Sequence, residues 1–217
     1  MSQPNAAAAP ANRMAHDTIV ITVITLVAGL ILSLVYGITL EPIRAQEAKA
    51  KEAACRAVFA DADSFSTVYE APNADLEAWL DETGFPKQNV DEVVQAKAAD
   101  GSALGYVLTV TTKEGYGGDI RFAMGVRADG TLNGISILEI SETAGLGMRA
   151  NTDAFKSQFA DKNVSLFRYT KNGARADDEI DALSGATVTT NAMTNGVNAG
   201  LSAVRYLHTH KIGGDDA

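Results

Sequence analysis

The chain has 217 residues, which is enough for one domain with an appended segment. Its 27 acidic and 18 basic residues give a formal charge of −9, which argues against a nucleic-acid partner because such a partner requires a basic surface. The single cysteine, Cys55, excludes an intramolecular disulfide, and the cysteine and the three histidines (His16, His208 and His210) have no metal-ligand spacing, so we predict no metal site.

The first predicted element is a membrane anchor. Residues 1–15 are rich in Ala, Pro and Asn, and we expect a disordered tail over residues 1–17. Residues 18–40 (TIVITVITLVAGLILSLVYGITL) carry no charge, and the run is long enough to cross a lipid bilayer as a helix. A secretory signal peptide is the alternative, but its apolar region is shorter and ends at a small-residue cleavage site. The sequence EPIRAQEAKA follows here, so we predict a retained single-pass helix in contact with membrane lipid.

The charges beside this helix leave its orientation open. Only Arg13 precedes the run, whereas four Lys or Arg residues follow it within residues 41–56. Counted alone, this pattern places the C-terminal part of the chain in the cytoplasm. Glutamates are interleaved with the basic residues, however, and long domains translocate with little regard to such counts.

Helix formers continue beyond the anchor. Residues 43–59 are dense in Ala, Glu, Lys and Gln, which predicts a helical stalk. Residues 75–81 (DLEAWLD) read as a short amphipathic helix that begins at an acidic cap. We therefore assign residues 41–92 to a stalk and helical lead-in, and residues 93–210 to the functional domain.

Strand patterns begin at about Val93. β-Branched and aromatic residues or alternating apolar positions predict strands over residues 103–112, 118–126 and 132–140. The Asp129-Gly130 pair predicts a hairpin turn between the last two. We further expect a helix near 153–159, a strand near 164–169 and a closing helix from about 189 to 208. The predicted fold class is α+β: an antiparallel sheet flanked by helices, with one N-terminal transmembrane helix.

A cluster of hydroxyl and small residues precedes the closing helix, in DALSGATVTTNAM (residues 181–193). Apolar residues from Met193 onward recur at steps of three and four, so the cluster lies where a helix begins. Unpaired backbone amides and the positive end of the helix dipole favour an anion there, and a phosphate is a natural occupant. The simpler interpretation is an ordinary Ser or Thr helix cap.

Three stretches together resemble one family. DALSGAT (181–187) is similar to the flavinylation motif Asp-x-x-Ser/Thr-Gly-Ala-Thr of the FMN-binding domain family, and GYGGDI (115–120) and ETAGLG (142–147) match the same family in the same order. The single span and the length make the chain similar to the G subunits of Rnf-type ion-translocating oxidoreductases. The C subunits of sodium-pumping NADH:quinone reductases are the second choice, because they are usually longer.

The resemblance implies roles for the residues that match the motif. Thr187 would carry covalent FMN through a phosphoester bond. Asp181, Ser184, Gly185 and Ala186 would be the recognition sequence for a separate flavin transferase. Chemistry also favours an outside enzyme, because a threonine hydroxyl is a poor nucleophile without a base and the motif contains no His or Lys.

In this family the loop that matches residues 142–147 of this chain lines the flavin. Carried over by position, that loop would place Glu142, Thr143, Gly145 and Leu146 beside the cofactor, and Ala144 stands where the family has proline. Tyr116 is a further expected flavin contact. Each of these loops could alternatively be only a Gly-rich turn.

The function that the resemblance implies is a flavoprotein component that relays electrons in a translocase. The chain would be anchored in the cytoplasmic membrane with its domain on the extracytoplasmic side, and would assemble with the other members of a complex that couples electron passage between ferredoxin and NAD to Na⁺ or H⁺ transport. We expect no catalytic acid–base residue in this chain, since the redox chemistry belongs to the flavin. The alternatives are a stand-alone FMN electron shuttle and a non-redox membrane-anchored module.

Overall fold

The computed structural model describes residues 11–212. The chain divides into two units, one up to Lys49 and one from Ala50. A single helix, α1 (Ala11–Val58), contributes to both.

The first unit consists of the N-terminal part of α1. This helix is long and apolar enough to span a membrane, in agreement with the anchor predicted at residues 18–40. The hydroxyls of Thr22 and Thr25 each donate to the carbonyl four residues earlier, at 2.8 Å, so these polar groups are satisfied inside the helix and suit an apolar surrounding. The prediction of a disordered tail over 1–17 is wrong for residues 11–17, which are helical: this segment contains no Pro or Gly, so nothing in it stops the helix before the apolar run. Residues 1–10 lie outside the described residues.

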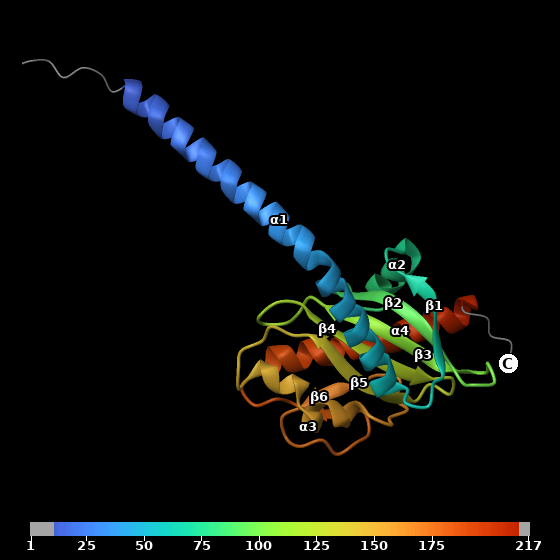
Figure 1. Ribbon diagram of the computed structural model, residues 1–217. Coiled ribbons are helices and arrows are strands. Elements are labelled where there is room, and N and C mark those ends of the chain that lie inside the picture. The colour runs from blue at the N-terminus through green and yellow to red at the C-terminus, as the bar shows by residue number, and fades with distance from the viewer. Residues whose placement is uncertain (1–10, 213–217) are drawn as a thin grey trace, which may run out of the picture. The chain divides into compact units, whose positions relative to one another are not determined.

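The second unit is built on a five-stranded antiparallel sheet in the order β1-β2-β3-β4-β5 (Figure 1). The strands are β1 (Ser64–Glu70), β2 (Gln88–Lys97), β3 (Ala103–Thr112), β4 (Ile120–Arg127) and β5 (Leu132–Glu139). The predicted strand at 103–112 coincides with β3, and the predicted hairpin lies between β4 and β5, where Gly130 has φ +86°. The predicted α+β class with an antiparallel sheet is confirmed.

The sheet begins earlier in the chain than its sequence pattern indicates. The predicted onset at about Val93 falls inside β2, and β1 precedes it. β1 lies at the edge of the sheet, has mostly exposed or half-buried residues, and therefore lacks a clear apolar alternation. β2 carries two adjacent acidic residues, Asp91 and Glu92, at a break in its register with β3, which interrupts the pattern further.

Each face of the sheet buries a different apolar layer. The helix α4 (Thr187–His210) lies across one face (Figure 1) and packs on inward side chains that include Leu108, Phe122 and Met124. A Cβ on Gly196 would come within 2.8 Å of the Phe122 ring, so glycine lets α4 lie close to the sheet. On the other face, the last turns of α1 pack against residues such as Val107, as alternation along a strand requires.

Shorter elements complete the domain. α2 (Ala74–Glu82) is capped by the Asn73 side chain, which accepts from two backbone amides, so the predicted acidic cap is wrong: Asn73 lies one residue before the helix and has the extended backbone that a cap requires. The predicted helix near 153–159 consists of α3 (Asp153–Lys156) and a 3₁₀ turn, Ser157–Phe159. A further 3₁₀ helix spans Gly147–Asn151. The strand expected near 164–169 is present only from Arg168, as the short β6 (Arg168–Thr170), which pairs in parallel with β7 (Glu179–Asp181).

Candidate functional site

A cavity of about 580 Å³ lies beside the start of α4. Three segments border it: the turn after β3, the loop after β5 and the residues around the N-terminus of α4. Its lining residues are Tyr116, Glu142, Thr143, Leu146, Gly147, Gly185, Ala186, Thr187, Val188 and Thr189. The structure thus brings together the three stretches that the sequence singled out, although they are separated along the chain by the sheet and the 3₁₀ segments.

The helix α4 begins without a side-chain cap. Its N-cap residue is Ala186, and no side chain of the described residues makes a capping hydrogen bond there. Thr187 is the first helical residue, and the first intrahelical amide donation at this end runs from Thr190 to the Ala186 carbonyl, at 3.0 Å. The interpretation of the hydroxyl cluster as an ordinary Ser or Thr cap is therefore wrong. The open amides at this end favour an anionic group.

The hydroxyls near this helix start have different surroundings. The Thr190 hydroxyl is fully buried, donates to the Ala186 carbonyl at 2.9 Å and accepts from the Leu183 amide at 3.0 Å. Thr187 is half-buried, borders the cavity, and makes no side-chain hydrogen bond to the described residues. Ser184 is exposed and lies outside the cavity lining. Thr189 also borders the cavity but is buried, at 1% exposed. Of the four hydroxyls at this helix start, Thr187 is therefore the one that both borders the cavity and remains partly exposed.

Two glycines allow the loops to close around the cavity. Gly185 has φ +77°, a conformation that residues with a Cβ rarely adopt, and a Cβ there would come within 3.1 Å of the Leu146 side chain. At Gly147 a Cβ would come within 2.5 Å of Glu142 Oε2 and 2.6 Å of Thr189 Oγ1. The 142–147 loop therefore packs directly on the first turn of α4.

Glu142 links the two loops that border the cavity. Its side chain is buried, and Oε1 accepts a hydrogen bond from the Tyr116 amide at 2.7 Å. This charge-assisted bond holds the 115–118 turn in place, while the Tyr116 ring remains 75% exposed at the cavity. The Thr143 carbonyl in turn accepts from the amides of Leu146 and Met148, which closes the loop after β5.

Asp181, the first residue of the motif, lies apart from the cavity. Its carboxylate accepts from the Ala174 amide at 2.5 Å, and its own amide donates to Gln158 Oε1 at 2.6 Å. These bonds hold the segment that leads into α4. Gly145 is likewise absent from the cavity lining.

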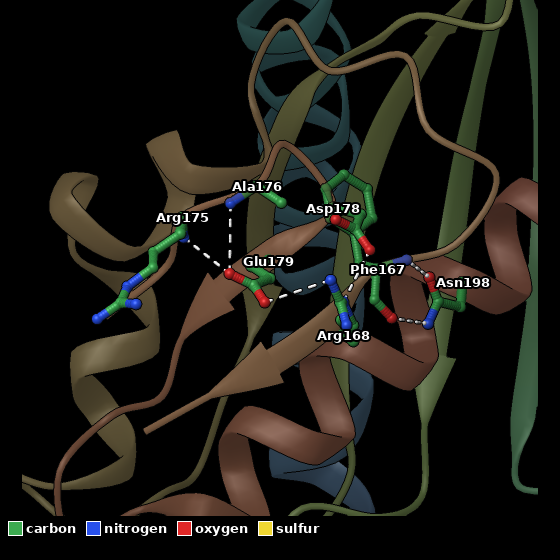
Figure 2. Close-up of polar contacts among 7 residues, drawn as sticks. All are labelled: Phe167, Arg168, Arg175, Ala176, Asp178, Glu179 and Asn198. Atoms are coloured by element: carbon green, nitrogen blue, oxygen red, sulfur yellow. Dashed lines mark hydrogen bonds and ion pairs between the residues drawn. The ribbon is translucent and has the colours of Figure 1, made fainter. Parts of the chain in front are cut away.

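The strand pair before the motif is fixed by the polar contacts in Figure 2. Arg168 donates to Asp178 at 2.8 Å and lies 3.3 Å from Glu179, whose other oxygen accepts from the amides of Arg175 and Ala176. Asn198, on α4, is buried and pairs with both the amide and the carbonyl of Phe167, at 2.7 and 2.8 Å. Both polar groups of Phe167 are thereby satisfied, and β6 is held against α4.

A second hollow, of about 480 Å³, shares Thr187 and Val188 with the first. Its other lining residues are Lys87, Lys113, Glu114, Gly115, Tyr169 and Asn191. Sequence reasoning missed the two lysines, because they come together only through the pairing of β2 with β3. It also did not single out Val188, which borders both hollows.

Comparison with known proteins identifies the family. Residues 115–202 match the FMN-binding domain family, a range that contains all three motif stretches. The chain is 30% identical over 193 residues to the G subunit of the Na⁺-translocating ferredoxin:NAD⁺ oxidoreductase complex of Acetobacterium woodii, covering 87% of this chain and 90% of that protein. The chain belongs to the family of G subunits of Rnf-type ion-translocating oxidoreductase complexes. The resemblance read from the sequence is confirmed.

A second relative agrees with this family. The G subunit of the proton-translocating ferredoxin:NAD⁺ oxidoreductase complex of Clostridium ljungdahlii is 30% identical over 185 residues, covering 85% of this chain and 88% of that protein. Among solved structures, NqrC of Shewanella oneidensis is similar with a TM-score of 0.48 and 16% identity, over 71% of this chain and 88% of that chain. The present chain combines an FMN-binding domain with an N-terminal apolar helix that is consistent with membrane anchoring.

Proposed function

We propose that this protein carries FMN covalently, through a phosphoester to the Thr187 hydroxyl, and relays electrons within an ion-translocating ferredoxin:NAD oxidoreductase complex. The observation that carries the proposal is the position of Thr187: a half-buried hydroxyl, free of side-chain hydrogen bonds within the described chain, at the uncapped start of α4 and on the wall of the cavity.

The cavity suits a flavin in size and chemistry. Its volume of about 580 Å³ falls within the range of cofactor sites. Tyr116, Leu146 and Val188 border it and are 75%, 43% and 51% exposed. Outside α1, the other exposed large apolar side chains among the described residues are Leu166 and Tyr169. Apolar exposure thus concentrates at this cavity, as expected where an aromatic ring system binds.

Attachment requires an outside enzyme. The titratable side chains in the cavity lining are Tyr116 and Glu142, and one Glu142 oxygen is already bonded to the Tyr116 amide. In the transfer that we propose, the Thr187 oxygen forms a bond to the 5′-phosphorus of a flavin nucleotide that is activated as a phosphoanhydride. The anhydride P–O bond breaks, its nucleotide fragment leaves, and the hydroxyl proton passes to a base of the flavin transferase.

The protein's own part is to hold and surround the cofactor. The flavin supplies the electron acceptance and donation, so this chain needs no acid–base residue for the chemistry. In this proposal Glu142, Thr143, Leu146 and Tyr116 border the flavin. The local structure that the transferase and the cofactor require is provided by Asp181, Ser184, Gly185 and Ala186, and by Gly145 in the neighbouring loop.

We further propose that the domain lies on the extracytoplasmic side of the cytoplasmic membrane, with lipid around residues 18–40 and the remaining members of the complex as partners. A covalent bond suits a site outside the cytoplasm, where a lost cofactor is not readily replaced. The family assignment outweighs the count of flanking basic residues, which long domains largely override.

The test is attachment of flavin to one residue. The full chain is expressed with a flavin transferase, denatured and separated on a gel, with Thr187→Val and Ser165→Ala beside the wild type; Ser165 is exposed and lies outside the motif and both hollows. We expect flavin fluorescence in the wild type and in Ser165→Ala, and none in Thr187→Val. Fluorescence that persists in Thr187→Val, or is absent from all three proteins, contradicts the proposal.

A further inference from the structure

The second hollow beside Thr187 is lined by basic side chains, which the first hollow lacks. It is lined by Lys87 and Lys113, with Glu114 as its one carboxylate among the lining residues. The chain as a whole has a formal charge of −9, so a hollow lined by two lysines has a local charge opposite in sign to that of the chain. Thr187 lies on the wall that this hollow shares with the apolar cavity.

The two lysines lie opposite each other, one residue beyond the paired ends of β2 and β3. The Lys113 amide donates to the Lys87 carbonyl at 3.0 Å, one step beyond the Gln88–Thr112 pair that ends the β2–β3 ladder. Like charges directly opposite each other on paired strands are destabilising. An anion between them would remove that repulsion.

Glu114 offsets this charge only in part. Its Oε2 accepts from Gln88 Nε2 and Asn195 Nδ2, each at 2.7 Å, which fixes the carboxylate in place. Its Oε1 lies 3.9 Å from Lys87 Nζ, at the limit of an ion pair. Among the described residues, no carboxylate lies within ion-pair distance of the Lys113 ammonium. One carboxylate therefore faces two ammonium groups.

From this arrangement we infer that Lys87 and Lys113 are positioning residues that bind the phosphate group of the flavin carried on Thr187. The inference rests on the proposed attachment site. A phosphodiester at Thr187 carries one negative charge, which matches the excess positive charge of the hollow. The apolar cavity then takes the ring system and the lysine hollow takes the anionic oxygens, so Thr187 stands between two sites of different chemistry.

This arrangement predicts that the lysines have opposite effects with and without flavin. In the flavin-free chain they repel each other, so neutralising them leaves the melting temperature unchanged or raises it. In the flavinylated chain they attract the phosphodiester, so the same substitutions lower it. A purely structural role of the two side chains would change both forms equally.

The experiment is a thermodynamic cycle on the full chain in detergent. Wild type and Lys87→Met/Lys113→Met are purified from hosts with and without the flavin transferase, and the melting temperature of each form is measured by circular dichroism. We expect flavin attachment to raise the wild-type melting temperature by about 2–4 °C more than that of the double variant, the shift that about 1 kcal/mol gives in a domain of this size. At molar salt this difference should shrink, because the lysines are exposed.

Matched controls separate charge from packing. Lys87→Arg/Lys113→Arg keeps both charges and should retain the wild-type gain, whereas Lys171→Met, an exposed lysine outside both hollows, should leave the gain unchanged. Lys87→Met and Lys113→Met are also measured singly, so that the cycle is complete if the double variant takes up little flavin.

Two outcomes overturn the inference: an equal change of melting temperature with and without flavin in the methionine variants, or loss of the gain in the arginine variant. Failure of the proposed function is distinct from both, because the wild type would then carry no flavin on Thr187.

Discussion

Thr187 and Thr190 lie one helical turn apart, and replacing each by valine should give opposite phenotypes. Thr190→Val removes a fully buried hydroxyl that accepts from the Leu183 amide and donates to the Ala186 carbonyl, at 3.0 and 2.9 Å. Valine has a similar volume, so the main change is a buried amide left without its acceptor. Thr187→Val removes a hydroxyl that makes no hydrogen bond to another described side chain or backbone group.

The expected magnitudes differ accordingly. An unsatisfied buried amide costs about 1–3 kcal/mol, so we expect Thr190→Val to lower the free energy of unfolding by about 2 kcal/mol. That corresponds to a fall in melting temperature of about 4–8 °C for a unit of this size. Thr187→Val should stay within about 0.5 kcal/mol of the wild type, as substitutions without a lost contact usually do. Only Thr187→Val should abolish flavin attachment completely.

The assay is thermal unfolding of the flavin-free full chain, followed by tryptophan fluorescence. Trp79 is the only tryptophan, and its indole donates to Ser202 Oγ on α4 at 3.0 Å, so its emission reports on the packing of α2 against α4. Flavin content is measured separately by in-gel fluorescence. Equal destabilisation by Thr187→Val and Thr190→Val, or an unchanged melting temperature in Thr190→Val, would contradict this prediction.

Three further substitutions test other parts of the account. Glu142→Ala should loosen the 115–118 turn and shift the flavin absorption band, because it removes the acceptor of the Tyr116 amide. The control Glu139→Ala, at an exposed position, should leave the band unchanged. A wild-type spectrum in both variants would contradict the role of Glu142. Asn198→Leu leaves the buried amide and carbonyl of Phe167 unpaired. It should therefore lower the melting temperature at least as much as Thr190→Val, which leaves one buried amide unpaired. An unchanged stability in urea or thermal unfolding would contradict this. Burial raises the pKa of Tyr69 to about 12, so above pH 10 the unfolded chain releases this proton first and stability falls as the pH rises toward 12. Tyr69→Phe should flatten that decline in pH-dependent unfolding, and an identical decline in the variant would show that other groups cause it.

Much of the sheet could be predicted because its central strands follow simple rules. β3 and β4 are buried on both faces or nearly so, and their β-branched, aromatic and alternating apolar residues identify them without reference to the rest of the chain. The turn at Asp129-Gly130 was predictable because glycine tolerates its positive φ. β1 could not be predicted in this way, since an edge strand with a mostly exposed surface carries no periodic signal.

The candidate site was predictable only where its residues are adjacent in the sequence. The segment from Ser184 to Thr187 and the 142–147 loop are local motifs, and the cavity brings most of their residues together. The structural part played by Asp181 was not predictable, because its partner, the Ala174 amide, belongs to an irregular loop. The Lys87–Lys113 pair depends on the register of β2 with β3, which the sequence alone does not specify.

The proposed function depends on a covalent bond at one threonine, and the mass of one peptide shows whether that bond exists. Trypsin releases residues 176–205 as a single fragment, because no Lys or Arg lies between Arg175 and Arg205. Isolated from membranes of the native host, this fragment should be heavier by the mass of FMN less one water, and fragmentation should assign the added mass to Thr187. An unmodified fragment, or an added mass on another residue, would contradict the account.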